Sequence, residues 1–184
     1  MKHATRFIKL FITGIHVDRF NIEPFWGDAY KHLDYSKEPF NNPDDTSRWT
    51  DMGFADNFVG AMCDMRKTQP VWTNAILAKF EVQLKWKDVC ASYYRMAPGT
   101  ILPTHSDTYK RYIELFGLEN NHQSIYRAIV FLEDWQSGHY LEVADEPVTK
   151  WKAGDVVTWW YDTPHLAANM GYTPRYTLQI TGHL

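Results

Sequence analysis

Three His-x-Asp pairs are the first sign of chemistry in this sequence, because a pair with this spacing can form part of a metal site. In an extended segment alternate side chains point to the same face, so the imidazole and the carboxylate of a pair would lie together. A second imidazole from elsewhere in the chain would complete a facial triad, which leaves open positions on a bound iron(II) ion. The pairs are His16 and Asp18, His32 and Asp34, and His105 and Asp107.

The surroundings of each pair, rather than the motif itself, favour His105 and Asp107 as metal ligands. A chain with eight histidines produces His-x-Asp by chance, so the spacing alone decides little. His16 and His32 lie in an irregular N-terminal region. His105 instead follows a strand-like segment and a Pro-Gly turn at residues 98–99, and the rest of the strand series comes after it.

The second imidazole is expected to come from one of the histidines that follow this pair, which are His122, His139, His165 and His183. His165 is favoured because Arg175 follows ten residues later, with Thr177 in phase on the same strand face. An arginine fork with a hydroxyl two residues on can hold one end of a dicarboxylate. A lone histidine is more often structural, so the prediction depends on the whole constellation of His105, Asp107, His165 and Arg175.

Short strand-like segments separated by turn signals make up the second half of the chain. They are residues 89–96, 125–132, 139–143, 156–161, 165–169 and 175–181. Many short strands at even spacing favour a sandwich or barrel over a parallel sheet. The last segment has a polar face, from Arg175 to Thr181, and an apolar face. A barrel with a polar lumen would produce this alternation, and so would a solvated sheet edge.

The first half of the chain gives mixed signals. Residues 7–15 are predicted to form a strand, residues 38–45 a loop and residues 71–86 a helix. A further short helix or lid is expected over residues 108–118. We expect a single domain over residues 1–184, mainly β with a few supporting helices that are mostly N-terminal. Residues 1–88 would form a supporting region and residues 89–184 the catalytic core.

The composition is that of a globular protein without a polyanionic partner. The chain has 184 residues, a net charge of −3 and scattered basic side chains, so bulk nucleic-acid binding is not expected. The two cysteines, Cys63 and Cys90, have no metal-type spacing and indicate a reduced, cytoplasmic protein. No run approaches the length of about 18 apolar residues that a membrane span needs. The sequence leaves the oligomeric state open.

The ordered motifs resemble a known superfamily over roughly residues 90 to 183. His105-Ser-Asp107, Trp151-Lys-Ala-Gly-Asp155, His165 and Arg175-Tyr-Thr177 look like the double-stranded β-helix core, a jelly-roll and cupin-like fold, of 2-oxoglutarate/iron(II)-dependent oxygenases. The stretch before Asp107 resembles the prolyl hydroxylases, which usually have lysine where Arg175 stands. The closing half is also similar to aspartyl/asparaginyl hydroxylases, a family that lacks the carboxylate ligand which Asp107 supplies.

The resemblance implies a dioxygenase that uses Fe(II), 2-oxoglutarate and O2. Hydroxylation of a peptide side chain, an amino acid or a small metabolite, with release of succinate and carbon dioxide, is the expected reaction. Three alternatives stay open at this point. They are a cupin-like protein that binds a metal or a small acid without turnover, a zinc hydrolase that uses the same three ligands, and a metal-free interaction module.

Several further side chains are candidates for contacts in such a site. Tyr94 is expected to bind the co-substrate, although a buried core tyrosine would fit the same position. Arg127, His139 and Trp159 are candidates for substrate contacts. The ordinary structural alternatives are a sheet-end cap for Arg127 and a surface position for His139. Trp159 and Trp160 face opposite ways on a strand, so at most one of them lines the cavity.

Overall fold

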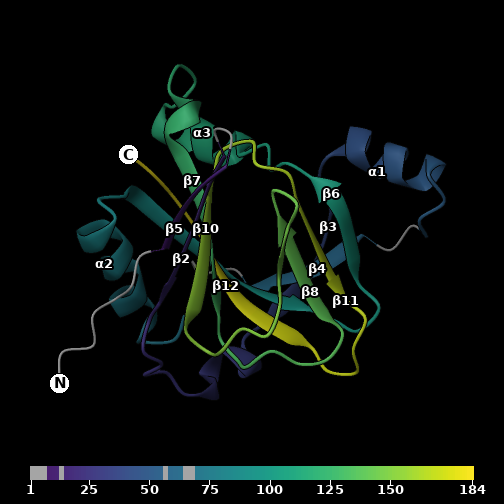
Figure 1. The fold of residues 1–184 in the computed structure, drawn as a ribbon, viewed down its shortest axis with the longest axis horizontal. Coiled ribbons are helices and arrows are strands. Elements are labelled where there is room, and N and C mark those ends of the chain that lie inside the picture. The colour runs from purple at the N-terminus through teal and green to yellow at the C-terminus, as the bar shows by residue number, and fades with distance from the viewer. Residues whose placement is uncertain (1–7, 13–14, 56–57, 64–68) are drawn as a thin grey trace.

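Antiparallel strands form most of the fold in the computed structural model, which describes residues 8–12, 15–55, 58–63 and 69–184 (Figure 1). The strands are β1 (Ile8–Ile12), β2 (Ile15–Asn21), β3 (Tyr35–Pro39), β4 (Val59–Cys63), β5 (Lys87–Met96), β6 (Ile101–His105), β7 (Ile125–Phe131), β8 (His139–Val143), β9 (Glu146–Val148), β10 (Asp155–Trp160), β11 (His165–Asn169) and β12 (Arg175–His183). The larger sheet has the order β1-β2-β10-β7-β12-β5-β4-β3, and the smaller sheet has the order β6-β11-β8-β9.

The mainly β architecture and the six predicted strands of the second half are confirmed. The strand β6 was not predicted, because Pro103 in its middle cannot donate to a sheet ladder. The structure places β6 at the edge of the smaller sheet, where a proline is tolerated. The N-terminal region contributes more than support, since β1 to β4 extend both ends of the larger sheet. Of the predicted strand at residues 7–15, positions 7 and 13–14 lie outside the described residues.

The predicted loop over residues 38–45 is confirmed only at residues 40–42, and the rest of that prediction was wrong. The strand β3 ends at Pro39, and the helix α1 (Pro43–Asp51) begins only a few residues later. The side chain of Asn42 accepts a hydrogen bond from the Asp44 backbone N–H at 3.2 Å, and Pro43 occupies the first helical position. These polar residues are therefore the start signal of a helix rather than a loop.

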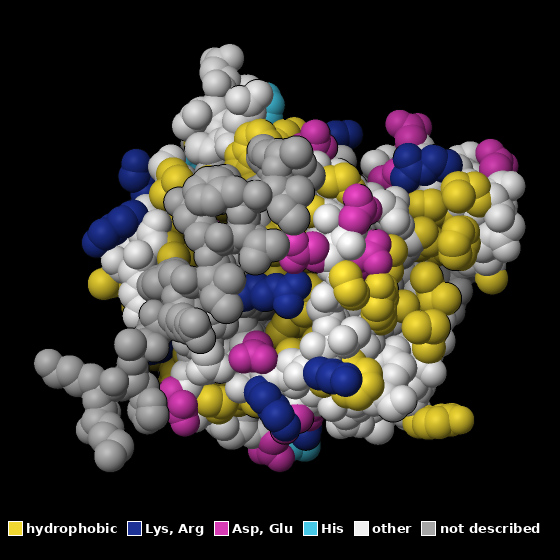
Figure 2. Space-filling view, viewed as in Figure 1, with side chains coloured by type: hydrophobic (Ala, Val, Ile, Leu, Met, Phe, Trp, Pro, Cys, Tyr) yellow, Lys and Arg dark blue, Asp and Glu magenta, His cyan; other side chains and the backbone are white. Residues whose placement is uncertain are grey.

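The helix α1 lies at one side of the molecule and is attached by its inner face (Figure 1). Trp49 is almost completely buried, with its ring 4.7 Å from that of Phe40 and 4.8 Å from that of Phe58. Apolar side chains are also exposed in this region (Figure 2), and Met52 and Phe54 just after α1 are among them. Because the charged sequence of α1 has few other apolar anchors, Trp49 provides most of its attachment.

The other two helices occur where they are predicted. The helix α2 (Thr73–Gln83) covers the outer face of the larger sheet, where Ile76 and Phe80 share a core with Leu178 and Ile180 of β12. The helix α3 (Lys110–Phe116) follows the His-x-Asp pair. Two short 3-10 turns occur at Asp28–His32 and His122–Ser124. Among the described residues no helix has the length and apolar character needed to cross a membrane.

Candidate metal centre

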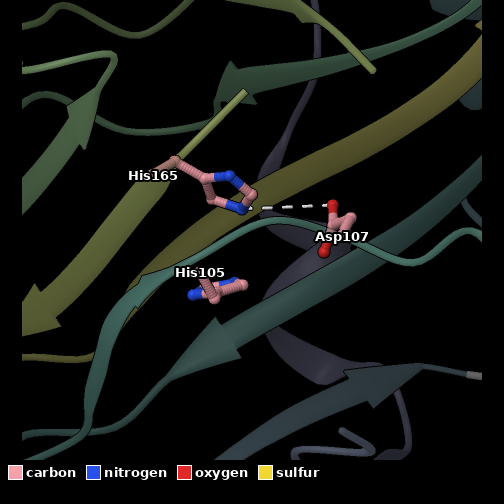
Figure 3. A group of neighbouring side chains, drawn as sticks. All are labelled: His105, Asp107 and His165. Carbon is pink, nitrogen blue, oxygen red and sulfur yellow. Dashed lines mark ion pairs between the residues drawn. The ribbon is translucent and has the colours of Figure 1, made fainter. Parts of the chain in front are cut away.

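His105, Asp107 and His165 converge between the two sheets (Figure 3). His105 ends β6 and His165 begins β11, and the two residues are direct partners in the antiparallel ladder. Asp107 follows β6 after one intervening residue. One potential ligand atom from each side chain lies within 4.8 Å of the other two. Within the described part of the chain, this is the one group of three ligand-type side chains that meets in this way, and the pair His32 and Asp34 does not contribute to it.

Both imidazoles are oriented by a backbone carbonyl. His105 Nδ1 lies 2.7 Å from the Pro103 carbonyl oxygen, and His165 Nδ1 lies 3.0 Å from the Thr163 carbonyl oxygen. A carbonyl oxygen can only accept, so Nδ1 carries the proton in each ring and Nε2 keeps its lone pair. Outer hydrogen bonds of this kind fix the ring orientation of metal-binding histidines.

Burial keeps the second imidazole in the neutral form that a metal requires. Desolvation lowers the pKa of His165 to about 4, although Asp107 opposes this shift. Burial would raise the pKa of the Asp107 carboxyl group, but the neighbouring Arg127, His165 and His105 together hold that pKa well below its usual range. The site therefore offers a neutral His165 imidazole and an Asp107 carboxylate at neutral pH, and these two groups together with the His105 ring nitrogen are suitable donors for a divalent ion.

The helix α1 and the segment just before it pack against His105. The rings of Phe40 and Trp49 pack edge-on against the imidazole, with ring centres 4.7 Å and 5.7 Å away. Arg48 donates a hydrogen bond of 3.1 Å to the carbonyl oxygen of Thr104, directly before His105. The N-terminal region thus restricts the position of a ligand that belongs to the second half of the chain, a contribution that no pattern in the sequence indicates.

A cavity of about 810 Å³ contains the three side chains at its wall. Apolar and aromatic side chains supply much of the remaining wall, among them Ile129, Phe131, Leu141 and Trp159. Trp159 is buried, and its ring centre lies 4.9 Å from that of His165, whereas Trp160 is directed elsewhere and donates to the Gln123 carbonyl oxygen. The residues around α3, including Tyr109 and Tyr112, line another part of the cavity.

Arg175 brings a buried positive charge to the same cavity. Its residue surface is 6% exposed, and Nη1 donates to the Tyr140 carbonyl oxygen at 2.7 Å. Its Nε atom has no hydrogen-bond partner, and the buried Tyr94 hydroxyl also has none. Among the described residues no carboxylate forms an ion pair with Arg175. Such buried donors are costly unless a ligand satisfies them.

Both groups remain in the form that can donate at neutral pH. Burial lowers the pKa of Arg175 to about 10, with the nearby Tyr94 opposing the shift, so the guanidinium stays charged. Burial raises the pKa of Tyr94 to about 12, with Arg175 opposing that shift, so the phenol keeps its proton. Gly60 makes room for this tyrosine, because a Cβ atom at position 60 would lie 2.0 Å from the Tyr94 hydroxyl oxygen.

The remaining predicted residues have different environments. Thr177 shares the inner face of β12 with Arg175 and is 2% exposed, but it does not line the cavity. His139 is also absent from the cavity wall, and it is not a surface residue. Its Nε2 atom lies 3.0 Å from the Thr173 carbonyl oxygen, and its ring stacks on Trp151. The strand β8 thus directs His139 into the core rather than toward the cavity.

Arg127 reaches the cavity, but its guanidinium is already engaged. Nε and Nη2 donate to Asp107 Oδ2 at 2.9 Å and 2.7 Å. Gln179 and Thr181, which the sequence analysis did not propose as site residues, line the cavity beside it. The alternation along β12 contained the signal for both, because they lie on the face of Arg175.

The metal-free protein is expected to lose stability as the pH falls from about 6.5 toward 4. In this window the unfolded chain protonates residue 165, which has an ordinary pKa of about 6.5, whereas folded His165 stays neutral. The contribution of His165 to stability is therefore fully present above this window, and within the window it falls by about 1.4 kcal/mol for each pH unit. Urea unfolding of chelator-treated protein at several pH values measures the slope. A His165→Asn variant should show a shallower slope, and an unchanged slope would contradict this assignment.

Known proteins of solved structure have a similar fold. A prolyl-4-hydroxylase from Pseudomonas putida has a similar structure at 17% sequence identity and a TM-score of 0.50, over 85% of this chain and 95% of that one. The non-heme alpha ketoglutarate dependent carbocyclase SnoK from nogalamycin biosynthesis is similar at 12% identity and a TM-score of 0.50, over 84% of this chain and 81% of that one. No curated protein matches the chain.

These likenesses concern the fold, and they confirm the predicted double-stranded β-helix. The sequence itself gives the family. Residues 28–182 match the family described as Aspartyl/Asparaginyl beta-hydroxylase, which is well over half of the chain and includes the three converging side chains and Arg175. The chain belongs to the aspartyl/asparaginyl β-hydroxylase family.

Proposed function

We propose that this protein is an iron(II)- and 2-oxoglutarate-dependent dioxygenase that hydroxylates a peptide side chain, an amino acid or another small metabolite. The observation that supports this most strongly is the buried Arg175, which forms no ion pair within the described part of the chain and lies in the same cavity as His105, Asp107 and His165. A metal site alone does not explain why the positively charged Arg175 side chain is also buried in this cavity. A co-substrate with one end for the metal and a carboxylate at the other end does explain it.

The donor set fits both groups. His105, Asp107 and His165 would hold iron(II), and Arg175 would bind the far carboxylate of 2-oxoglutarate through its guanidinium. The unpartnered Tyr94 hydroxyl would donate to the same co-substrate. Bound iron(II) would couple the oxidative decarboxylation of 2-oxoglutarate by O2, which yields succinate and carbon dioxide, to hydroxylation of the substrate.

The wall of the cavity would control water and orientation. Ile129, Phe131 and Leu141 are apolar, so they provide no hydrogen bonds to water near the metal ligands. A low-dielectric wall also strengthens the attraction between Arg175 and an anionic ligand. These side chains therefore favour a bound dicarboxylate over solvent in the same space.

Oxygen-dependent succinate release tests the proposal. Protein supplied with Fe(II), 2-oxoglutarate and ascorbate should release succinate slowly in air, and a screen of amino acids and peptides should identify compounds that accelerate this release. Protein loaded with zinc in place of iron serves as a control and should release none. If wild-type protein releases no more succinate than a His105→Ala variant, the proposed activity is wrong.

A further inference from the structure

Arg127 holds one particular oxygen of Asp107. Its Nε and Nη2 atoms both donate to Oδ2, at 2.9 Å and 2.7 Å, and the pair is partly buried, with side chains 18% and 23% exposed. An oxygen that accepts two charge-assisted hydrogen bonds has its lone pairs occupied. The other carboxylate oxygen, Oδ1, is therefore the one that Asp107 can offer to a metal ion.

The guanidinium is itself fixed from two further directions. Nη1 donates to Thr181 Oγ1 at 2.8 Å, and the guanidinium carbon lies 5.1 Å from the ring centre of Tyr109. In the sheet Arg127 is the direct neighbour of Thr181 on β12 and of Trp159 on β10. A side chain held by its strand, a hydroxyl and a ring has little freedom to release Oδ2.

Without these two hydrogen bonds from Arg127, both oxygens of Asp107 could bind the metal. Oδ2 lies 4.0 Å from His165 Nε2, so it is within reach of an ion held between the two imidazoles. Carboxylates bind metals through one oxygen or through both, and the second mode uses one more coordination position. An oxygenase site needs its open positions for the co-substrate and O2.

We infer that Arg127 is a positioning residue that restricts Asp107 to a single-oxygen contact with the metal. The inference rests on the metal site of the proposed function. It assigns Arg127 to the metal ligand Asp107. The sequence had instead suggested that Arg127 contacts a substrate. Its effect is to keep open one coordination position that a chelating carboxylate would fill.

The number of water molecules bound to Mn(II) tests this inference without 2-oxoglutarate. The electron paramagnetic resonance lines of protein-bound Mn(II) broaden in oxygen-17-enriched water in proportion to the bound waters. The Arg127→Met variant should bind one water fewer than wild type, because Asp107 then chelates the ion. Arg127→Lys keeps the charge but has neither the fork nor the Thr181 contact, so it should also bind one water fewer. This second variant keeps the test decisive if Arg127→Met fails to fold.

The control is Arg95→Met, which removes another arginine of the larger sheet. Arg95 lies over the ring of Tyr35 at 5.1 Å and is outside the cavity wall, so the water count should equal that of wild type. A wild-type water count in either folded Arg127 variant would overturn the inference. Failure of wild-type protein to bind Mn(II) would contradict the metal centre itself. Failure to bind 2-oxoglutarate would contradict only the co-substrate proposal, because this test does not use it.

Discussion

Replacing Arg175 by methionine is expected to weaken 2-oxoglutarate binding by roughly a hundredfold to a thousandfold. Loss of one partner from a buried, hydrogen-bonded charge pair costs about 3 to 4 kcal/mol, which corresponds to that factor in affinity. Titration calorimetry of the Mn(II)-loaded protein without oxygen measures the effect. Tyr94→Phe removes only a neutral donor and should cost about tenfold or less.

The same Arg175→Met substitution should leave the metal-free protein at least as stable as wild type. Arg175 is buried without a counter-ion, and an apolar side chain of similar length removes that desolvation cost. Its hydrogen bond to the Tyr140 carbonyl oxygen offsets part of the gain. A structural role for Arg175 predicts the opposite, a clear loss of stability. Arg95→Met is the matched control and should keep wild-type affinity for 2-oxoglutarate. Unchanged affinity in Arg175→Met would show that Arg175 is not the anchor.

Replacing His105 by alanine is expected to lower the affinity for divalent metal by more than about a thousandfold. Loss of an outer hydrogen-bond partner costs about 10- to 100-fold, and loss of a ligand itself costs more. Competition with a chromogenic chelator measures the change. His183→Ala is the control, because His183 is also buried but pairs with Asp88 at 2.8 Å, outside the cavity. Equal metal affinity in wild type and His105→Ala would exclude the triad.

Arg175 also separates the proposed activity from the alternatives that share its fold. A zinc hydrolase could use His105, Asp107 and His165 as ligands. Its reaction would not require the buried guanidinium of Arg175 in the same cavity. Zinc binds such donors more tightly than iron does, so zinc in a purified sample decides nothing. The dependence of 2-oxoglutarate binding on Arg175 is therefore more informative than the identity of the metal that copurifies.

The parts of the site that the sequence predicted are those encoded by alternation along strands. His105 ends β6 and Asp107 lies two residues further on, just past the strand, so their spacing still identified them as a pair. Alternation along β12 groups Arg175 with Gln179 and Thr181. His165 was identified by its order in the chain relative to Arg175. Such local patterns survive folding because a strand that turned over would expose its apolar face.

The parts that were missed depend on contacts between distant segments. Trp49 supports His105 from a helix whose polar start resembled a loop, and nothing near position 105 indicates that contact. The hydrogen bonds between Arg127 and Asp107 join a strand to a loop. Arg127 donates to Oδ2 of Asp107 from a position that depends on the strand register, which places Thr181 beside Arg127. His139 was misplaced because a histidine after a turn glycine is usually exposed, whereas here β8 directs it against Trp151.

The visible absorption of the protein with Fe(II) and 2-oxoglutarate in the absence of oxygen tests the central claim most directly. Chelation of 2-oxoglutarate by iron held in this site should produce a weak charge-transfer band. The band should be absent in His105→Ala and should require far more 2-oxoglutarate in Arg175→Met. A wild-type protein that shows no band, or a His105→Ala variant that keeps it, would contradict the account.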